Sequence, residues 1–306
     1  MTHWYDIRPT FTEDGDTIVV GRPAFVASFH SEPGLAQHAA AILDAWLALL
    51  PPDTTLWYSH EKTRQYLKLT LKALARIRVD FSVKSLDQKY ASYLIKSAPE
   101  GGPVDECHRY SFEMYAVDGH SGYVFLTLPL DHVEEQGPDL VVRWFGDWCA
   151  RFAFTHAGAG YGYEQAWFGE QSQCVGPAML SVALRFHGVR AWVRSTARFR
   201  TLGKTTLDTA AWMTFLDAGS VNDVGAESLG RIDRRVSQYK IGSGVLLRAG
   251  ETPDPGDSNR RNDAYAMLKS VNDCIVPIRT TKWYQNYWGT PDDPEKEDRW
   301  FRRMDR

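Results

Sequence analysis

Residues 17–47, TIVVGRPAFVASFHSEPGLAQHAAAILDAWL, predict a strand that is followed directly by a helix. The stretch from Thr17 to Phe29 is rich in valine, isoleucine and phenylalanine, which pack well on the surface of a sheet. Glu32-Pro33-Gly34 then interrupts it, and apolar residues recur at helical spacing up to Leu47. This segment therefore contributes a strand and an amphipathic helix to the fold.

Further strands and helices follow along the chain. The alternation of Ile77, Val79, Phe81 and Val83 predicts a half-buried strand. Because strands and helices are mixed without strict alternation, the sequence predicts an α+β fold. Other helices are expected around 67–74, 140–152, 175–186 and 265–275, and other strands at 54–58, 110–117, 123–128, 156–167 and 241–249.

A segment rich in proline and glycine, residues 98–105, divides the chain. Its composition is typical of a linker or a long surface loop. The order of strands and helices repeats loosely on its two sides. The sequence is therefore interpreted as two loosely similar strand–helix lobes, residues 1–98 and 106–280, followed by an aromatic and charged tail, residues 281–306.

The composition argues against several classes of protein. Hydrophobic residues make up 43% and charged residues 24% of the 306 residues, as in ordinary globular proteins. No stretch approaches the roughly 20 apolar residues of a membrane span, and the first residues lack the apolar region of a signal peptide. We therefore expect a cytoplasmic protein without membrane contact. Lys and Arg (35) nearly balance Asp and Glu (38), so direct nucleic-acid binding is not expected.

No motif in the sequence predicts a metal ion or a cofactor. The glycine-rich segment 156–164 lacks the Gly-Lys-Ser/Thr ending of a phosphate loop and the spacing of a dinucleotide-binding turn. Its glycines lie two residues apart, on one face of a strand, where a helix or another backbone is expected to approach closely. The nine histidines are scattered, without the spacing of a metal site.

One arrangement resembles nuclease chemistry. Asp80 and Asp87 are carboxylates of the kind that hold a divalent metal ion, and Lys89 is a side chain of the kind that orients a water molecule. Short spacing and the lack of a third acid favour solvated surface charges instead. A metal-dependent, nuclease-like hydrolase is therefore kept as the alternative function.

An acidic loop, residues 251–257, precedes the last predicted helix of the second lobe. Two prolines and a glycine fix its turn. Asp257, Ser258 or Asn259 is expected to cap the helix that follows. The loop has two interpretations at this point, a helix cap alone or a helix cap that also contacts a partner.

The tail is distinguished by its aromatic residues. Trp283, Tyr284, Tyr287 and Trp288 fall on one side of a helix if the segment is helical. Such a cluster either clasps the core or forms a binding hot spot. The clasp is favoured, because large aromatic side chains are usually buried.

Several motifs in the second half of the chain occur together. Trp212-Met-Thr-Phe-Leu216 is followed by Gly244-Val-Leu-Leu-Arg-Ala-Gly250, then by Pro253, Pro255-Gly-Asp257, Asn259-Arg260 and a closing amphipathic helix. This set resembles the TsiV family of type VI secretion immunity proteins. The resemblance is weaker upstream, through Gly158–Glu164 and Arg185-Phe-His-Gly188.

The chain departs from the family pattern at two places. Family members usually have a proline where this chain has His187. The aromatic tail beyond Lys282 is expected to have no family counterpart.

The resemblance implies a function for residues 1–306 as a whole. It implies an immunity protein that binds a cognate effector with a VRR-type nuclease domain and covers the active site of that domain. It supplies no catalytic residues, so the chain is not expected to be an enzyme. The missing export signal implies a toxin that acts in the cytosol. A scaffold protein of the secretion machinery is a third interpretation.

A nuclease partner implies an acidic binding surface, because Lys and Arg shape a nuclease site for phosphates. The first candidates are the acids of the 251–257 loop, and the second are the acids that follow the Trp212 motif. The aromatic tail supplies further candidates. The expected partner-binding residues are Glu251, Asp254, Asp257, Asp217, Asp223, Trp283, Tyr287 and Trp288.

Overall fold

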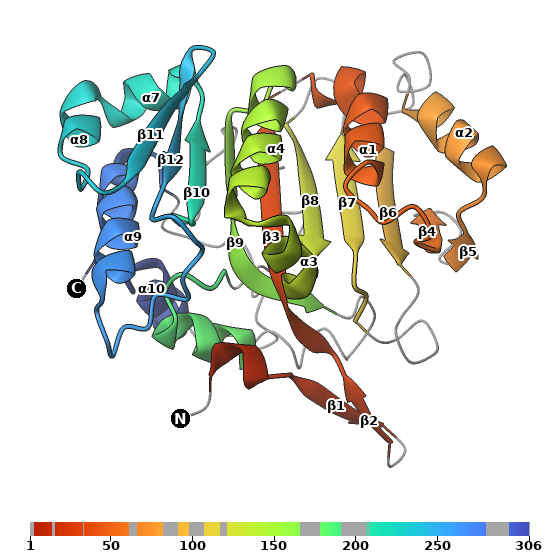
Figure 1. Ribbon diagram of the computed structural model, residues 1–306, viewed down its shortest axis with the longest axis horizontal. Helices are drawn as coiled ribbons and strands as arrows, with labels where there is room; N and C mark the ends of the chain where they lie inside the picture. Colours follow the sequence, from red (N-terminus) through yellow and green to blue (C-terminus); the bar gives the residue numbers. More distant parts are fainter. Residues whose placement is uncertain are drawn as a thin grey trace.

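The computed structural model describes most of the chain and places its secondary structure around one large sheet (Figure 1). The described residues are 3–13, 16–32, 34–60, 66–81, 91–97, 107–116, 121–165, 178–190, 207, 209–279 and 294–305.

Within these described residues the sheet has ten strands, and every pair of neighbours is antiparallel. Their order is β11-β12-β10-β9-β3-β8-β7-β6-β4-β5. The strands are β3 (Gly21–Ser31), β4 (Leu56–His60), β5 (Tyr66–Lys68), β6 (Ala91–Ser97), β7 (Ser111–Ala116), β8 (Gly122–Leu128), β9 (His156–Gln165), β10 (Met213–Leu216), β11 (Ser237–Ile241) and β12 (Gly244–Arg248).

Strand β3 lies in the interior of this sheet. Phe25 pairs with Leu128 of β8 on one side, and His30 pairs with His156 of β9 on the other. The strands of the two expected lobes therefore share one sheet, in which β3 is flanked on both sides by strands from residues 106–280. The predicted α+β class is confirmed.

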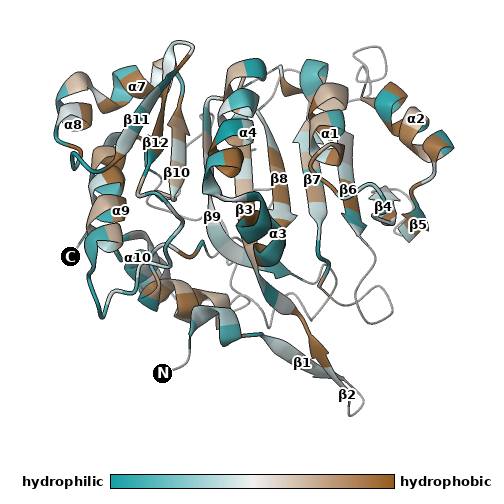
Figure 2. Cartoon of the chain, in the orientation of Figure 1, coloured by the Kyte–Doolittle hydropathy of each residue, from teal (hydrophilic) through white to brown (hydrophobic). Residues whose placement is uncertain are grey.

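Helices α1 (Ala39–Leu47), α3 (Leu130–Gln136) and α4 (Pro138–Arg151) cover one face of the sheet (Figure 1). Polar and apolar residues both occur along α4, as expected for a helix with one face on a core (Figure 2). Its Phe145 packs 5.0 Å from Phe29 of β3, between ring centroids. Trp46 of α1 is fully buried and packs against Phe112 of β7. The large core therefore lies between these helices and the sheet.

Helix α9 (Asp263–Cys274) packs on the opposite face at the β10–β12 end of the sheet. Leu246 belongs to the same cluster as α4, whereas the next residue, Leu247, packs with Val271 of α9. Successive residues of a strand point to opposite faces, so α4 and α9 enclose this strand from two sides. Helices α7 (Ala218–Val224) and α8 (Ala226–Gly230) adjoin this end.

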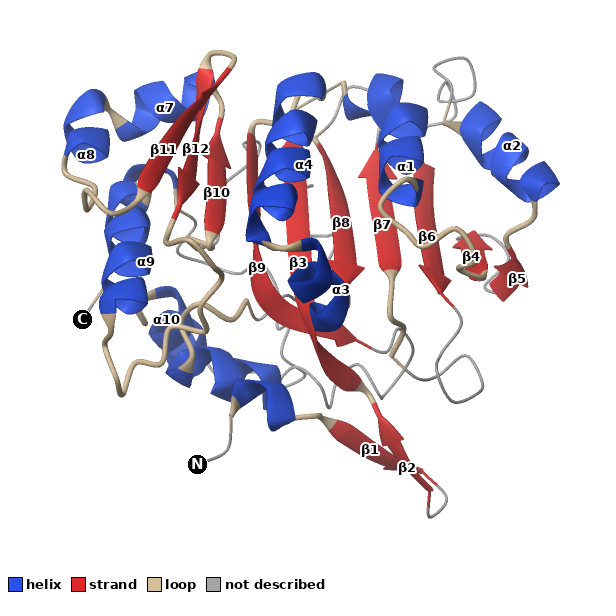
Figure 3. Ribbon diagram, in the orientation of Figure 1, coloured by secondary structure: helices blue, strands red, loops and turns tan. Residues whose placement is uncertain are grey.

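The N-terminus and the C-terminal helix meet in a third cluster. Trp4 and the fully buried Trp300 pack there with Met179 and Phe186. Trp4 lies in a short 3-10 helix (Trp4–Asp6), Trp300 lies in α10 (Pro294–Phe301), and Met179 lies in a helical segment at 178–185. A hairpin of β1 (Thr10–Glu13) and β2 (Asp16–Val19) extends away from the large sheet (Figure 3).

The strand predicted from Ile77 to Val83 is wrong, because Leu71–Asp80 forms helix α2. Ile77 and Phe81 are buried, whereas Val79 is 64% exposed. Residues four apart share one face of a helix, so the spacing of Ile77 and Phe81 fits a helix as well as a strand. Thr70 favours the helix, because its side chain accepts a hydrogen bond from the Ala73 N–H and caps the first turn.

Among the described helices, none combines the length and the apolar character needed to cross a membrane.

Candidate partner-binding site

The glycine-rich strand β9 carries another segment of the chain across one of its faces. Arg190 donates its backbone N–H to the Tyr161 carbonyl at 2.8 Å, and it forms an isolated parallel bridge with Gly162. A Cβ atom at Gly162 would lie 2.6 Å from Val26 Cγ2 and 3.2 Å from the Arg190 carbonyl oxygen. The expected close approach of another backbone to these glycines is therefore confirmed.

The acidic loop 251–257 is joined to the same segment through its backbone. His187 and Gly188 donate their N–H groups to the carbonyls of Gly256 and Pro255, each at 2.9 Å. The Asp254 carboxylate accepts the Gly256 N–H at 2.7 Å. The loop is therefore held in place before any partner binds, which reduces the entropy lost on binding.

Asp257 links this loop to two arginines. Its Oδ2 lies 3.5 Å from Arg185 Nη2 and 3.9 Å from Arg260 Nε, and its Oδ1 accepts the Asn259 N–H at 3.0 Å. The side chain is only 13% exposed. Asp257 therefore contacts both arginines and the backbone that follows the loop.

The predicted helix cap is wrong by a few residues. Helix α9 begins at Asp263, and Asn262 caps it by accepting the Tyr265 N–H at 2.9 Å. Neither Asp257 nor its two following residues has this role. Arg261, with φ of +44°, lies between them and the cap, so the turn is longer than the sequence pattern indicated.

A cavity of about 420 Å³ opens where the loop, the 185–186 segment and the N-terminus meet. Trp4 packs against Tyr161 with ring centroids 4.8 Å apart, and the Arg185 guanidinium lies 4.6 Å from the centre of the Phe186 ring. The cavity is lined by His3, Trp4, Tyr5, Leu130, Glu134, Tyr161, Arg185, Phe186, Pro255, Asp257 and Arg260.

The charges that line the cavity balance. Arg185 and Arg260 face the carboxylates of Glu134 and Asp257 in the same lining. Burial raises the pKa of Tyr161, and the nearby acids Glu134 and Asp254 raise it further. The phenol therefore remains protonated and can donate a hydrogen bond. An aromatic wall with a few fixed polar groups suits an amphipathic side chain of a partner protein.

The structure does not bring all of the expected acids together. Asp217 caps helix α7 by accepting the Ser220 N–H at 2.7 Å, and Asp223 is exposed on the same helix. Strand β12 begins beside Leu216 and ends just before Glu251, so these two acids lie at the opposite end of the strand from the loop. Glu251 is exposed.

Several other candidates lie outside the described residues. They are Trp283, Tyr287 and Trp288 of the tail, and Asp87 and Lys89 of the nuclease-like arrangement, so their expected roles stay predictions.

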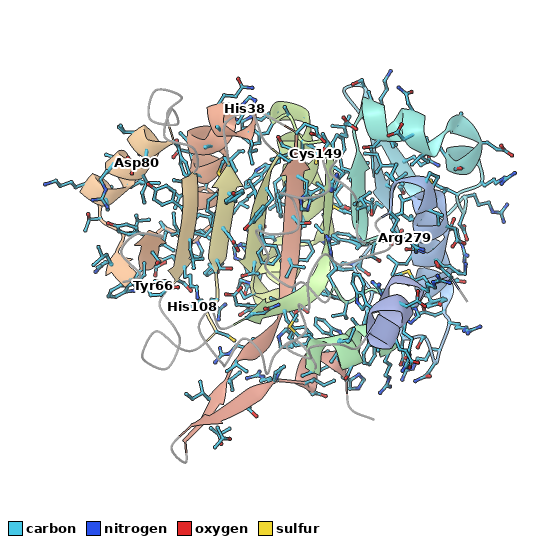
Figure 4. The ribbon with its side chains drawn as sticks, turned by 180° about the vertical axis from the view of Figure 1, so that it is seen from behind. His38, Tyr66, Asp80, His108, Cys149 and Arg279 are labelled. Carbon is cyan, nitrogen blue, oxygen red and sulfur yellow. The ribbon has the colours of Figure 1, made fainter. Side chains whose placement is uncertain are left out.

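The remaining member of the nuclease-like arrangement, Asp80, ends helix α2 (Figure 4). It accepts a hydrogen bond of 2.5 Å from the Tyr93 hydroxyl. Within the described part of the chain, no three His, Cys, Asp or Glu side chains are arranged to hold a metal ion.

The sequence pattern missed the N-terminal wall of the cavity, formed by His3, Trp4 and Tyr5. The signal available was the adjacent aromatic pair close to the chain start, because large aromatic residues are usually anchored by packing. The sequence did not indicate where in this chain these residues pack. The Trp4 carbonyl accepts a hydrogen bond from the Tyr163 hydroxyl, 159 residues away.

His187 is expected to make the stability of the site dependent on pH. It is 5% exposed and its ring packs at a 45° tilt against Tyr265, and burial, with a further contribution from Arg303, lowers its pKa to about 4. The unfolded chain takes up a proton near pH 6.5, whereas the folded chain does not until about pH 4. Stability present above pH 6.5 is therefore lost as the pH falls towards 4, by about 3 kcal/mol.

Urea unfolding of the wild type and of His187→Phe at pH 7, 6, 5 and 4 measures this effect. The variant should lose less stability than the wild type over the interval. Parallel pH profiles for the two proteins would exclude His187 as the source.

The architecture as a whole is shared with a solved protein. The Pseudomonas aeruginosa T6SS protein PA0821 has the same fold, with a TM-score of 0.77 and 18% sequence identity over 94% of this chain and 83% of that one. A comparison with curated proteins found no match.

The family is shown by the sequence. The model of the family TsiV, type VI immunity for VRR-NUC, matches residues 53–304. This chain belongs to the TsiV family. The match includes just under half of the first predicted lobe, residues 53–98, and nearly all of the tail beyond Lys282, which was expected to lack a family counterpart.

Proposed function

We propose that this chain binds the VRR-type nuclease domain of a cognate type VI effector in the cytoplasm and occludes the active site without catalysing a reaction. The observation that carries the proposal is the cavity, because two motifs of the family resemblance form it together. Arg185 and Phe186 line one side, and Pro255 and Asp257 line the other. The family match and a pre-formed binding loop support the same function.

The exposed end of the loop supplies the electrostatic component. Glu251 is exposed and Asp254 is half-buried, so both are close to an approaching partner. A nuclease presents cations where it holds the phosphates of its substrate, and carboxylates on the inhibitor attract these cations over a distance. The acids are expected to raise the association rate, while the cavity contributes to the lifetime of the complex.

Neutralising Glu251 and Asp254 should slow association with the nuclease domain and weaken its dependence on salt. The variants Glu251→Gln and Asp254→Asn keep the size of each side chain, and the amide oxygen introduced by Asp254→Asn would still accept the Gly256 N–H. Removing one charge from a pair that is fully desolvated in the complex costs on the order of 2–5 kcal/mol, because the other charge is left buried without a partner. Stopped-flow association at two salt concentrations measures the effect, and thermal unfolding should show little change.

Asp223→Asn tests the second acidic surface in the same assay, because Asp223 is an exposed acid at the far end of β12. A slower association for this variant alone would place the interface on α7. Wild-type kinetics for all three variants would remove both acidic surfaces from the interface.

The function itself is tested by co-expression. The neighbouring reading frame is expected to encode a cytosol-acting nuclease that arrests growth, and this chain is expected to restore growth. Continued arrest despite abundant folded protein would refute the proposed function. Purified chain incubated with DNA and Mg²⁺ or Mn²⁺ should leave the DNA intact, whereas cleavage would support the hydrolase alternative.

A further inference from the structure

Strand β11 forms one edge of the ten-stranded sheet and is exposed along nearly its whole length. Ser237, Gln238, Tyr239 and Lys240 are all exposed, although their side chains alternate between the two faces of the strand. Both faces of β11 are therefore open, as well as its outer edge. Tyr239 is one of the large apolar residues that the structure leaves exposed.

The register of the hairpin shows which backbone groups of β11 point outwards. A two-residue turn, Gly242-Ser243, joins the strands, and Ile241 pairs with Gly244 beside it. The pair that flanks such a turn exchanges its hydrogen bonds, and the pattern then alternates along an antiparallel ladder. Ile241, Tyr239 and Ser237 therefore bond to β12, whereas Gln238 and Lys240 direct their N–H and C=O groups away from the sheet.

The neighbouring strand supports this alternation. The Ala249 N–H bonds to the Trp212 carbonyl at 2.8 Å, so odd-numbered residues from Val245 to Ala249 bond towards β10. The even-numbered residues, including Leu246 opposite Tyr239, are left to bond towards β11. In the part of the chain that the structure describes, no hydrogen bond uses the outward groups of Gln238 and Lys240.

We propose that β11 is a docking edge, to which the effector adds an extended segment as a further antiparallel or parallel strand. This inference rests on the proposed function and adds a second contact to the same interface. The two surfaces are continuous, because Ser237 pairs with Arg248, whose guanidinium donates to the Glu251 carbonyl. A partner seated on the acidic loop therefore lies beside the start of β11.

The charges near β11 indicate which kind of segment fits. Arg231 is paired with Glu227, and Arg235 with Asp233, whereas no ion pair engages Arg234 or Lys240 among the described residues. A segment that carries carboxylates would neutralise these two cations. A second copy of this chain would instead bring the same cations together, which disfavours pairing of β11 with itself.

Proline substitution tests the backbone contact separately from the side chains. Gln238→Pro removes an outward N–H while leaving the bonds to β12 in place, because proline is tolerated at such edge positions. Gln238→Ala keeps the N–H and is the matched control. The proline variant should bind the nuclease domain roughly tenfold more weakly, with the alanine variant close to the wild type. Equal affinities for the proline variant and the wild type, with both folded, would overturn the proposal.

Amide hydrogen exchange gives a second test that does not depend on a variant. In the free protein, the amides of Gln238 and Lys240 should exchange fast, while those of Tyr239 and Ile241 are protected by β12. Binding of the nuclease domain should protect Gln238 and Lys240 as well. Unchanged exchange at these two amides in a saturated complex would contradict the docking edge.

The outcomes separate the two proposals. If the wild-type chain does not bind the nuclease domain, the proposed function fails and the docking edge fails with it. If the wild type binds and the Glu251 variant associates slowly while Gln238→Pro behaves normally, only the docking edge is refuted. Protection of Gln238 and Lys240 that rises with the concentration of this chain alone would identify a second copy as the occupant and overturn the assignment to the effector.

Discussion

Trp300→Ala is expected to lower the free energy of unfolding by about 3–5 kcal/mol, the range for removal of a buried tryptophan side chain. Trp300 is fully buried in the cluster that contains Trp4 and Phe186. The Arg303 guanidinium lies 4.2 Å from the centre of its ring and donates to the Trp300 carbonyl. Urea unfolding followed by fluorescence and circular dichroism measures the loss.

The effect should extend beyond α10. Trp300 and the N-terminal wall of the cavity belong to one cluster, so the variant should also weaken effector binding. Truncation before Trp283 removes α10 and should lower the melting temperature as well. It also removes Asp305, whose carboxylate pairs at 2.8 Å with Arg279, the arginine labelled in Figure 4.

Arg302→Ala is the matched control for Trp300→Ala. Arg302 is on the same turn, its side chain is 67% exposed, and its partner is the exposed Asp298. An exposed ion pair contributes less than about 1 kcal/mol, so the control should unfold almost as the wild type does. A Trp300→Ala protein as stable as this control would show that α10 does not pack on the core.

The second large effect is expected from Gly188→Ala. A Cβ atom at this position would collide with the Asp254 carbonyl oxygen and lie 3.0 Å from the Pro255 carbonyl carbon. These are backbone atoms, which cannot turn aside as a flexible side chain does. Either the loop moves away or the 186–190 segment leaves β9, at a cost of about 1–3 kcal/mol.

The displaced loop should lose its fit to the effector. Binding of the nuclease domain is expected to weaken by roughly tenfold or more, because about 1.4 kcal/mol corresponds to a factor of ten. Isothermal titration calorimetry and thermal unfolding on the same samples measure both consequences. A variant with lowered stability and unchanged affinity would remove the loop from the interface.

Gly230→Ala serves as the control for an added methyl group. Gly230 ends helix α8, and a Cβ atom added there would meet no atom within 4 Å in the described part of the chain. This substitution should leave stability and affinity nearly unchanged, or raise stability slightly because alanine is the better helix former.

Much of the fold could be predicted from the sequence, because local periodicity decides local structure. Within residues 17–47, the predicted helix is α1 and most of the predicted strand is β3, although Thr17–Val19 belongs to β2 of the separate hairpin. The strand predicted around Ile77 was wrong, because Ile77 and Phe81 lie four residues apart. That spacing fits the alternation of a strand as well as one face of a helix. The joining of β3 to β8 and β9 could not be predicted, because no short-range signal specifies pairings between strands so far apart.

The candidate site could be predicted only in part. The 251–257 loop was recognised from its acids and its turn residues, but its partner segment was not. His187 and Gly188 hold the loop through backbone N–H groups, which every residue except proline possesses. Such contacts leave no pattern in the side chains. The N-terminal wall of the cavity was missed for a similar reason, since it depends on contacts with β9 more than 150 residues away.

The central place of β3 has a consequence for how the protein is made. It is the first strand of the large sheet to leave the ribosome, yet its neighbours are β8 and β9, which end at Leu128 and Gln165. At typical rates of translation, the interval between the end of β3 and the end of β9 is on the order of ten seconds. During that time the newly made chain carries an apolar strand with at least one open edge, which is a substrate for chaperones and a starting point for aggregation.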